Sequence, residues 1–361
     1  MNTPTYQAIT SIRQEMGESL CIIGHHYQID SVIRHTNHRG DSLALARIVD
    51  SVPAKNIVFC GVYFMAESAA LLARPDQSVF LPVPTSECEM ATMSPPEQVL
   101  AVLARLEASG RKCIPVTYVN STLAIKAAVG AAGGTVCTSA NARQILAWAL
   151  ERGDCVLFVP DRNLGANTAR DLGIPEAQVH CLKNKHTPHL LQPFAPEAFT
   201  ADAVDLDSPS ATGAKILLWP GYCPIHETFT LEHVKAVRSA HPEARIVVHP
   251  ECRPAIVQAV DGAGSTTYCI KAVQQAATGA TVVVGTELNL VKRLQAEYHG
   301  QKTVLPLAES ECSYMMETTE QALLDCLLDI KNGGTRYKAE AAPHLAADAR
   351  LALERMLEIC R

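Results

Sequence analysis

The chain has 361 residues, 48% of them hydrophobic, and a formal net charge of -6 at pH 7. This length and composition can bury a substantial core, which predicts a globular protein of two or three domains. It contains no block of like charges and no apolar run of the ~20 residues that cross a bilayer, so we expect no nucleic-acid and no membrane partner.

The N-terminal residues lack the basic and then apolar order of a secretion signal, so we expect a cytoplasmic protein. A first helix should follow Thr3, which can cap it, with Pro4 at the first helical position. The strand LCIIG comes next. From there, short runs rich in Val and Ile alternate with amphipathic stretches rich in Ala and Leu, the pattern of parallel strands joined by helices. The predicted class is therefore α/β.

One order of elements recurs three times along the chain: strand, helix, strand, helix, and a strand that leads through proline to a cysteine. The three passes run from LCIIGHHYQ to SVFLPVPTSEC, from KCIPVTYVN to KILLWPGYC, and from RIVVHPE to KTVLPLAESEC. They end at Cys88, Cys223 and Cys312. If the repeated units pack around a pseudo-threefold axis, the three endings face one region. The irregular stretch before Trp219 is predicted to be an inserted surface loop.

Polar residues stand at the carboxyl ends of the predicted parallel strands, the edge at which α/β proteins bind ligands. The candidates are His25, Tyr27, Tyr118, Asn120, Ser139, His249 and Glu251. Alternate residues of an extended segment point the same way, so each closely spaced pair can face one cavity. For His25, which adjoins His26, a surface role is an open alternative, and for Tyr118 a hydrogen bond within the core is another. For His249 and Glu251 the alternative is a capping histidine beside a salt-bridged glutamate.

The thirteen cysteines are odd in number and scattered singly, which argues against a disulfide framework. Most lie in apolar strands, where a thiol acts as a small hydrophobic group. No CxxC pair is present, so local spacing predicts neither a zinc nor a redox motif.

Ten motifs in order resemble the signature of the quinolinate synthase family, from about Cys21 to Cys326. They are GHHYQ, GDSLALA, FCGVYFMAESA, VTYVNST, VCTSANA, FVPDRNLG, LLWPGYCPIH, VVHPEC, GSTT and VGTELNLVKRL. The resemblance implies three homologous three-layer α-β-α domains with parallel sheets around a pseudo-threefold axis, with the active site at their central interface. The expected domains are 1–95, 96–224 with an insertion at about 173–214, and 225–312. Helices within 313–361 should pack back on the first domain.

The resemblance further implies a [4Fe-4S] cluster with only three cysteine ligands, one from each domain. These are Cys88, Cys223 and Cys312. Cys252 in HPEC is left unligated in this pattern. A fourth thiolate would close the cluster for electron transfer, whereas an iron without a protein ligand can act as a Lewis acid.

The implied activity is condensation of iminoaspartate with dihydroxyacetone phosphate to quinolinate, with loss of phosphate and two waters, in de novo NAD biosynthesis. Functional coupling to an L-aspartate oxidase is expected. The substrate-binding residues that the resemblance implies are His25, Ser42, Tyr118, Asn120, Ser139, His249, Glu251 and Thr266. The catalytic residues are Tyr27, Tyr118, His249 and Glu251. Glu251 is the preferred general base, because a cavity poor in water could raise its pKa into a useful range.

Other interpretations stay open on the sequence alone. Helix capping would explain Ser42, Ser139 and Thr266 taken singly. Asp161 and Asn163 are expected to form a turn, while Glu67 and Glu287 are expected to support the site or a domain contact. A different [4Fe-4S] hydro-lyase, or a non-enzymatic scaffold bridged by zinc, would use the same cysteines.

Overall fold

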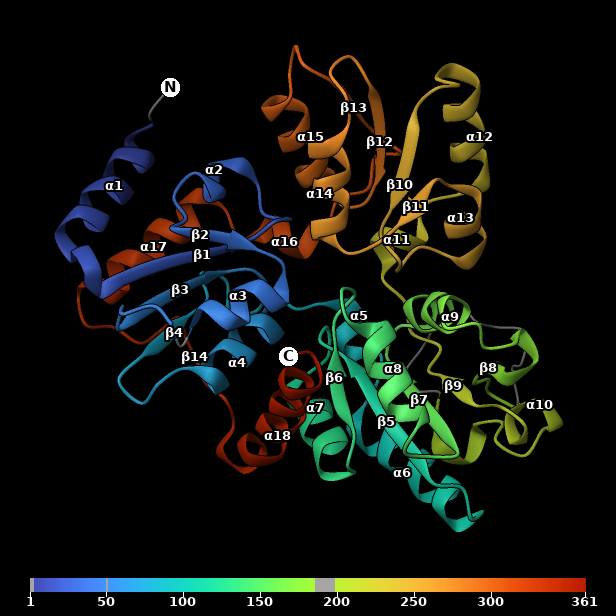
Figure 1. Cartoon of the computed structure of the whole chain (residues 1–361). Helices are drawn as coiled ribbons and strands as arrows, with labels where there is room; N and C mark the ends of the chain where they lie inside the picture. Colours follow the sequence, from blue (N-terminus) through green and yellow to red (C-terminus); the bar gives the residue numbers. More distant parts are fainter. Residues whose placement is uncertain (1–2, 50, 186–198) are drawn as a thin grey trace. The chain divides into compact units, whose positions relative to one another are not determined.

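The computed structural model describes residues 3–49, 51–185 and 199–361 and divides into two compact units. Unit 1 contains Met1–Cys88, His241–Arg245 and Thr266–Ala342, and unit 2 contains Glu89–Ala240, Ile246–Ser265 and Pro343–Arg361. Three mostly parallel sheets flanked by helices confirm the predicted α/β class and its α-β-α layering (Figure 1). The three-domain boundaries and the pseudo-threefold axis stay predictions.

The first sheet lies in unit 1 and has the strand order β14-β4-β3-β1-β2. Its strands are β1 (Leu20–His25), β2 (His38–Gly40), β3 (Asn56–Cys60), β4 (Ser78–Phe80) and β14 (Lys338–Ala339). All neighbours pair in parallel except β14, which is antiparallel to β4. Its connecting helices are α2 (Asp30–Ile33), α3 (Ser42–Val49) and α4 (Tyr63–Leu72). β1 is buried along its whole length, as the apolar sequence predicts for a central strand.

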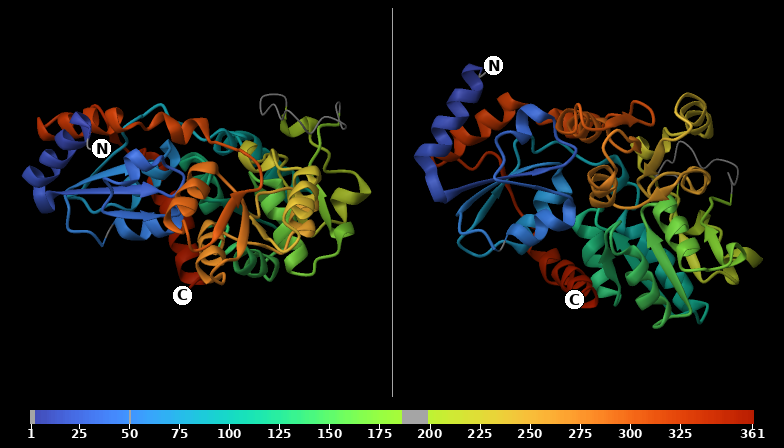
Figure 2. Two further views of the ribbon diagram at one scale, coloured as in Figure 1. Left: turned by 90° about the horizontal axis from the view of Figure 1, so that it is seen from above. Right: turned by 45° about the horizontal axis from the view of Figure 1, so that its top comes forward.

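The N-terminal helix α1 (Pro4–Met16) begins as the sequence predicts. The Thr3 side chain accepts a hydrogen bond from the backbone N–H of Tyr6 at 3.1 Å, and Pro4 occupies the first turn. α1 packs against α17 (Glu320–Lys331), and Figure 2 shows the two helices side by side. Ile9 and Leu323, both fully buried, belong to the apolar cluster that fixes this pair to the sheet.

The second sheet lies in unit 2 and has the order β6-β5-β7-β9-β8, all parallel. Its strands are β5 (Cys113–Tyr118), β6 (Thr135–Cys137), β7 (Cys155–Val159), β8 (Val179–Cys181) and β9 (Ile216–Leu218). The helices before β9 are α5 (Glu89–Thr92), α6 (Pro96–Ala108), α7 (Leu123–Ala131), α8 (Ala142–Leu150), α9 (Arg162–Asp171) and α10 (Pro209–Thr212). Trp219, fully buried, donates its indole N–H to the carbonyl of Met93 and joins the core of this sheet.

The predicted insertion at about 173–214 is more ordered than the expected surface loop. β8 lies within it and pairs with β9 as the edge strand of the second sheet, with His180 opposite Leu217. Residues 186–198 of the insertion lie outside the described part of the chain. A three-residue strand with one His and one Cys carries no clear alternation, so its sequence could not be distinguished from a loop.

The third sheet holds β10 (Arg245–Val248), β11 (Gly262–Ala263), β12 (Thr281–Gly285) and β13 (Thr303–Pro306). β10 pairs with β11 in unit 2, and β12 pairs with β13 in unit 1, both in parallel. The neighbouring helices are α11 (Pro224–Glu227), α12 (Leu231–Ala240), α13 (Pro254–Ala259), α14 (Thr266–Gln275), α15 (Leu288–Glu297) and α16 (Ser313–Glu317). Short 3₁₀ turns occur at Gly17–Ser19, Glu176–Gln178 and Ala201–Ala203.

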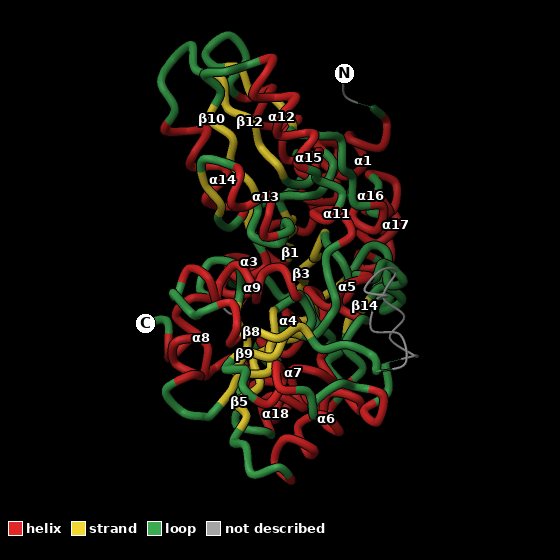
Figure 3. The backbone as a smooth tube through the Cα atoms, turned by 90° about the vertical axis from the view of Figure 1, so that its right-hand side faces the viewer, coloured by secondary structure: helices red, strands yellow, loops and turns green. Residues whose placement is uncertain are grey.

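The helices after residue 312 do not all pack where we expected them. α17 and β14 belong to unit 1, but α18 (Pro343–Ile359) belongs to unit 2, where it packs on α7 (Figure 3). The two helices can pack this closely because residue 130 of α7 is a glycine. A Cβ atom at Gly130 would lie 2.0 Å from the carbonyl oxygen of Asp348. The hydroxyl of Thr135 adds a hydrogen bond of 3.0 Å to the carbonyl of Ala352. Among the described residues, no helix has the length and apolarity needed to cross a membrane.

Candidate functional site

The three cysteines proposed as cluster ligands share one local setting. Cys88 directly precedes α5, and Cys223 and Cys312 are the N-terminal cap residues of α11 and α16. All three are partly exposed, whereas seven other cysteines, Cys252 among them, are buried. Free N–H groups and the helix dipole at such positions stabilise a thiolate. Cys88 and Cys312 lie in unit 1, and Cys223 lies in unit 2.

Within unit 1, the segments that carry Cys88 and Cys312 are hydrogen-bonded to each other. The hydroxyl of Ser86, which is fully buried, donates to the carbonyl of Tyr314 at 2.7 Å. Burial raises the pKa of the Cys312 thiol to about 11. A free Cys312 is therefore protonated at neutral pH, and a metal would have to displace that proton on binding.

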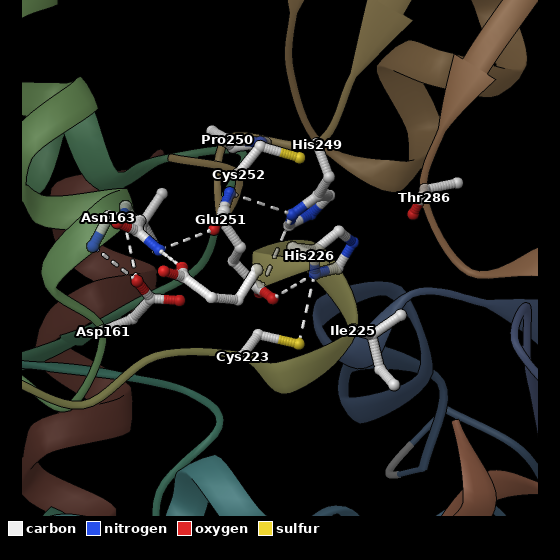
Figure 4. Close-up of polar contacts among 12 residues, drawn as sticks. Asp161, Asn163, Cys223, Ile225, His226, His249, Pro250, Glu251, Cys252 and Thr286 are labelled. Atoms are coloured by element: carbon white, nitrogen blue, oxygen red, sulfur yellow. Dashed lines mark hydrogen bonds and ion pairs between the residues drawn. The ribbon is translucent and has the colours of Figure 1, made fainter. Parts of the chain in front are cut away.

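His226 is a buried residue of the unit 2 site that we did not predict. It lies three residues after Cys223, so α11 presents both side chains on one face. Its Nδ1 atom is 3.2 Å from Cys223 Sγ and 2.8 Å from Glu251 Oε2 (Figure 4). One possible ligand atom from each of these three residues lies within 4.8 Å of the others, so the group could hold a metal ion. The three-residue spacing between Cys223 and His226 in CPIH is the sequence signal that could have identified His226.

Glu251 follows β10 and is almost fully buried beside two imidazole rings. Its Oε1 atom is 3.8 Å from His249 Nδ1, and the rings of His249 and His226 stack with centroids 4.6 Å apart. Burial acts to raise the pKa of Glu251, but the charges of His249 and His226 and hydrogen bonds from His226 and Tyr118 outweigh it and lower the pKa. The expectation of a raised pKa was therefore wrong, because it counted desolvation without these partners.

Asp161 caps α9, as the turn-forming role predicts. Its Oδ1 atom accepts hydrogen bonds from the backbone N–H groups of Asn163 at 2.7 Å and Leu164 at 3.0 Å. Burial raises the pKa of Asp161 well above its usual value, and the negative charge of Glu251 raises it further. Two buried carboxyl groups of unit 2 are thus shifted in opposite directions.

The two asparagines of α9 hold the segment that carries Glu251. Asn163 Nδ2 donates to the carbonyl of Glu251 at 3.1 Å and to Glu227 Oε2 at 2.7 Å. Asn167 Nδ2 donates to the carbonyls of Pro250 and Cys252, each at 2.8 Å. Asn163 therefore does more than form the predicted turn, because it fixes the backbone beneath a candidate catalytic residue (Figure 4).

The remaining unit 2 candidates surround the end of β5 and the start of α8. Tyr118 is buried and hydrogen-bonds to Glu251. Asn120 has a buried Oδ1 atom without a hydrogen-bond partner among the described residues. Ser139, partly exposed, lies between β6 and α8. Lys126 of α7 is fully buried, and its ammonium group donates a hydrogen bond to the carbonyl of Ser121. Because Ser121 follows Asn120, this bond fixes the loop that carries Asn120.

In unit 1, Tyr27 is held by two threonine hydroxyls. Its hydroxyl lies 2.8 Å from Thr286 Oγ1 and 3.3 Å from Thr266 Oγ1. His25 is the last residue of β1. Its Nδ1 atom accepts a hydrogen bond from the backbone N–H of Tyr27 at 3.2 Å, and its ring lies edge-on to the Tyr27 ring. Ser42 and Thr266 are the first residues of α3 and α14. Thr286, between β12 and Glu287, was not predicted.

Glu287 caps α15 and is fully buried. Burial raises its pKa to about 7, although hydrogen bonds from the backbone N–H groups of Leu290, Asn289 and Cys312 oppose the rise. The bond from Cys312 links this carboxyl to the segment that carries a proposed ligand. This contact agrees with the supporting role expected from the sequence.

Each unit thus assembles part of the predicted site. Unit 1 brings Tyr27 and Thr266 together with Thr286, and it ties the Cys88 and Cys312 segments to each other. Unit 2 brings Tyr118, His249 and Glu251 together with His226 and Cys223. The joining of these groups in one active site is a proposal taken up below.

Comparison with known proteins gives one consistent result. A family model described as quinolinate synthetase A protein matches residues 7–358. A quinolinate synthase of Corynebacterium glutamicum is 40% identical over 359 residues, which cover 98% of this chain and 87% of that protein. The quinolinate synthase of Lysinibacillus sphaericus is 39% identical, over 97% of this chain and 92% of its own length. The quinolinate synthase of Halobacterium salinarum is 39% identical, over 99% of this chain and 92% of its own length.

Proposed function

Because this chain belongs to the quinolinate synthetase A family, we propose that it is a quinolinate synthase. The proposed reaction condenses iminoaspartate with dihydroxyacetone phosphate and releases quinolinate, phosphate and two waters. It would be a step of de novo NAD biosynthesis in the cytoplasm, coupled to an L-aspartate oxidase that supplies the imine.

The observation that most supports this proposal is the common setting of three thiols. Cys88, Cys223 and Cys312 are partly exposed and each stands at the start of a short helix, a position that suits thiolate ligands. Cys252 is fully buried, and its carbonyl is held by Asn167. The donor set therefore fits a [4Fe-4S] cluster with three cysteine ligands. When bound, such a cluster would supply a Lewis-acidic iron towards the hydroxyl and carboxylate groups of the substrate.

The unit 1 residues are proposed to bind anionic groups and to move a proton. Ser42 and Thr266 combine a hydroxyl with the free N–H groups of a helix start, which suits phosphate or carboxylate oxygens. His25 is proposed to donate a further hydrogen bond to the same anionic groups. Tyr27 can give its proton to a substrate oxygen while a threonine hydroxyl supports the charge left on the phenol.

The unit 2 residues are proposed to orient the imine and to accept protons. Asn120 can both donate to a carboxylate and accept from an imine N–H. Ser139 is a second donor. Glu251 remains the proposed general base, and its lowered pKa means that it is ionised and ready at neutral pH but weakly basic. The neighbouring imidazole of His249 gives the accepted proton a second carrier.

Anaerobic purification followed by iron and sulfide analysis tests the ligand assignment. Cys312→Ser should abolish the cluster, whereas Cys252→Ser should retain it. Loss of the cluster in Cys252→Ser alone would reverse the assignment. Incubation with the two substrates should then yield quinolinate, and formation of another dehydration product would favour a different [4Fe-4S] hydro-lyase.

A zinc protein is the second candidate, favoured by the mixed sulfur, nitrogen and oxygen group of Cys223, His226 and Glu251. It predicts a colourless protein that is stable in air and contains zinc. The proposed cluster predicts a brown protein with broad absorption near ~400 nm that bleaches in oxygen.

A further inference from the structure

Unit 1 contains a pocket that no part of the proposed reaction uses. It has a volume of about 250 Å³ and is lined by His26, Arg39, Thr267, Ile270, Lys271, Gln274, Leu290, Arg293, Leu294 and Glu297. At about 30 Å³ for each molecule of liquid water, this space is on the order of eight water molecules. A pocket of this size suits a small metabolite rather than a nucleotide or a peptide.

Two helices supply most of the wall, and their sequence spacing explains how. The α14 residues stand at positions i, i+3, i+4 and i+7 from Thr267 to Gln274. The α15 residues repeat the same spacing from Leu290 to Glu297. Residues so spaced share one face of a helix, so α14 and α15 each contribute one face to the pocket lining.

The charges of the lining favour an anion. Arg39, Lys271 and Arg293 are positive, and Glu297 is the one acidic residue among the lining residues. Arg293 is already engaged with Asp30 at 2.6 Å and with the carbonyl of His26. Arg39 and Lys271, in contrast, make no side-chain hydrogen bond or ion pair with any residue in the described ranges.

The buried His26 lies among charges of both signs at the edge of this pocket. The pKa of His26 is lowered to about 4, mainly by burial; the negative charge of Asp41 opposes this shift, and the positive charges of Arg293 and Arg39 contribute to it. The carboxylate of Asp41 accepts hydrogen bonds from the Thr267 hydroxyl at 3.0 Å and the Ala44 N–H at 2.9 Å, and its negative charge lies beside the pocket. Among the described residues, it forms no ion pair with Arg39 or Lys271.

We propose that this pocket is a second anion-binding site, separate from the proposed active site, that takes a small dicarboxylate or phosphate monoester. Arg39 and Lys271 hold the anionic group from β2 and α14, because neither has a competing side-chain partner in the part of the chain that the structure describes. Charge-assisted hydrogen bonds from guanidinium and ammonium groups are among the strongest that an exposed site can offer. Ile270, Leu290 and Leu294 provide an apolar wall for the carbon skeleton of the ligand.

Binding to the intact holoprotein tests the site without any need for turnover. Inorganic phosphate and succinate serve as separate probes in calorimetric titrations and in protection of lysines from acetylation by mass spectrometry. We expect at least one probe to slow acetylation of Lys271 threefold or more and to leave the exposed Lys235 unchanged. Protection by phosphate alone assigns a phosphate ester, protection by succinate alone assigns a dicarboxylate, and protection by both assigns their shared dianion chemistry.

The double variant Arg39→Gln/Lys271→Gln should bind the protecting probe at least tenfold more weakly. The matched control Arg143→Gln/Lys235→Gln removes the same charge from exposed positions in unit 2 and should bind like the unmodified protein. Absence of Lys271 protection by both probes, or unchanged binding in the pocket variant, would overturn the proposal. A protein that makes no quinolinate can still bind the probe here, so failure of the proposed function would be seen separately.

Discussion

Gly130→Ala should loosen the attachment of α18 to unit 2. The added Cβ atom would lie 2.0 Å from the carbonyl oxygen of Asp348, far inside van der Waals contact, and both groups belong to helix backbones that cannot turn aside. Replacing glycine by alanine in a helix gains about 1 kcal/mol of propensity. Forcing two packed helices apart costs about 1–3 kcal/mol by overpacking and also forfeits dispersion contacts of buried residues such as Leu353.

The clash should win, and we expect a net loss of about 2 kcal/mol in the free energy of unfolding of unit 2. For a domain of this size that loss lowers Tm by roughly 4–8 °C. Calorimetry measures the change, and hydrogen exchange of the α18 amides should quicken at the same time.

Gly213→Ala is the matched control for this substitution. Gly213 has an ordinary φ, and the nearest atom to its added Cβ is the Pro209 carbonyl oxygen at 3.3 Å. The free energy of unfolding of the Gly213→Ala protein should stay within about 0.5 kcal/mol of that of the parent protein. A Gly130→Ala protein with unchanged Tm and slow exchange in α18 would refute the packing argument.

Three further substitutions test other parts of the structure. Thr286→Val removes a hydroxyl 2.8 Å from that of Tyr27, and loss of about 1 kcal/mol of hydrogen bonding should lower kcat about fivefold with little change in KM. His226→Gln deprives the buried Glu251 of a charge-assisted partner worth about 1.5–3 kcal/mol, so kcat/KM should fall roughly 10- to 100-fold. Glu320→Gln should cost about 1 kcal/mol of stability at pH 7 and almost nothing in acid, measured by urea unfolding at both pH values.

The sign of the pH effect follows from the pKa of Glu320. Burial acts to raise it, but hydrogen bonds from His35 and Arg34 outweigh burial and lower it below the usual value. The resulting stability is present above the unfolded pKa of about 4.3 and is lost as the pH falls through the folded value. An equal loss of unfolding free energy in Glu320→Gln at pH 7 and pH 3 would contradict this reasoning.

A steady-state assay of one variant at an exposed position calibrates the kinetic predictions. His241→Gln changes an exposed histidine in unit 1 and should leave kcat/KM unchanged. If His226→Gln behaved in the same way, the hydrogen bond to Glu251 would have no part in the reaction. Unchanged kcat in Thr286→Val would likewise remove Thr286 from the support of Tyr27.

Local chemistry made much of the fold predictable. Thr3 and Pro4 specify the start of α1, and the predicted strand LCIIG forms most of β1. The packing of α18 was not predictable, because its amphipathic pattern says which face is buried but not which helix covers it. A contact such as Gly130 against Asp348 appears only in three dimensions.

The candidate site shows the same division. Strand ends and motifs identified Tyr27 and Glu251, because polar residues after apolar strands stand out in a sequence. The shift of the Glu251 pKa required knowledge of its neighbours, since burial and paired histidines act in opposite directions. Thr286 was missed because its partner Tyr27 comes from a distant segment. For His226 the spacing from Cys223 was visible in the sequence, but its contact with Glu251 was not.

The position of α18 in chain order has a consequence for biosynthesis. Every segment of unit 1 is translated before this helix is made, yet the helix packs on α7 of unit 2, which begins at Glu89. The nascent chain must therefore carry an uncovered face of α7 while unit 1 is still being translated. A chaperone that shields apolar surface during synthesis should be most needed in that interval, and stalling translation before Pro343 should leave unit 2 sensitive to protease.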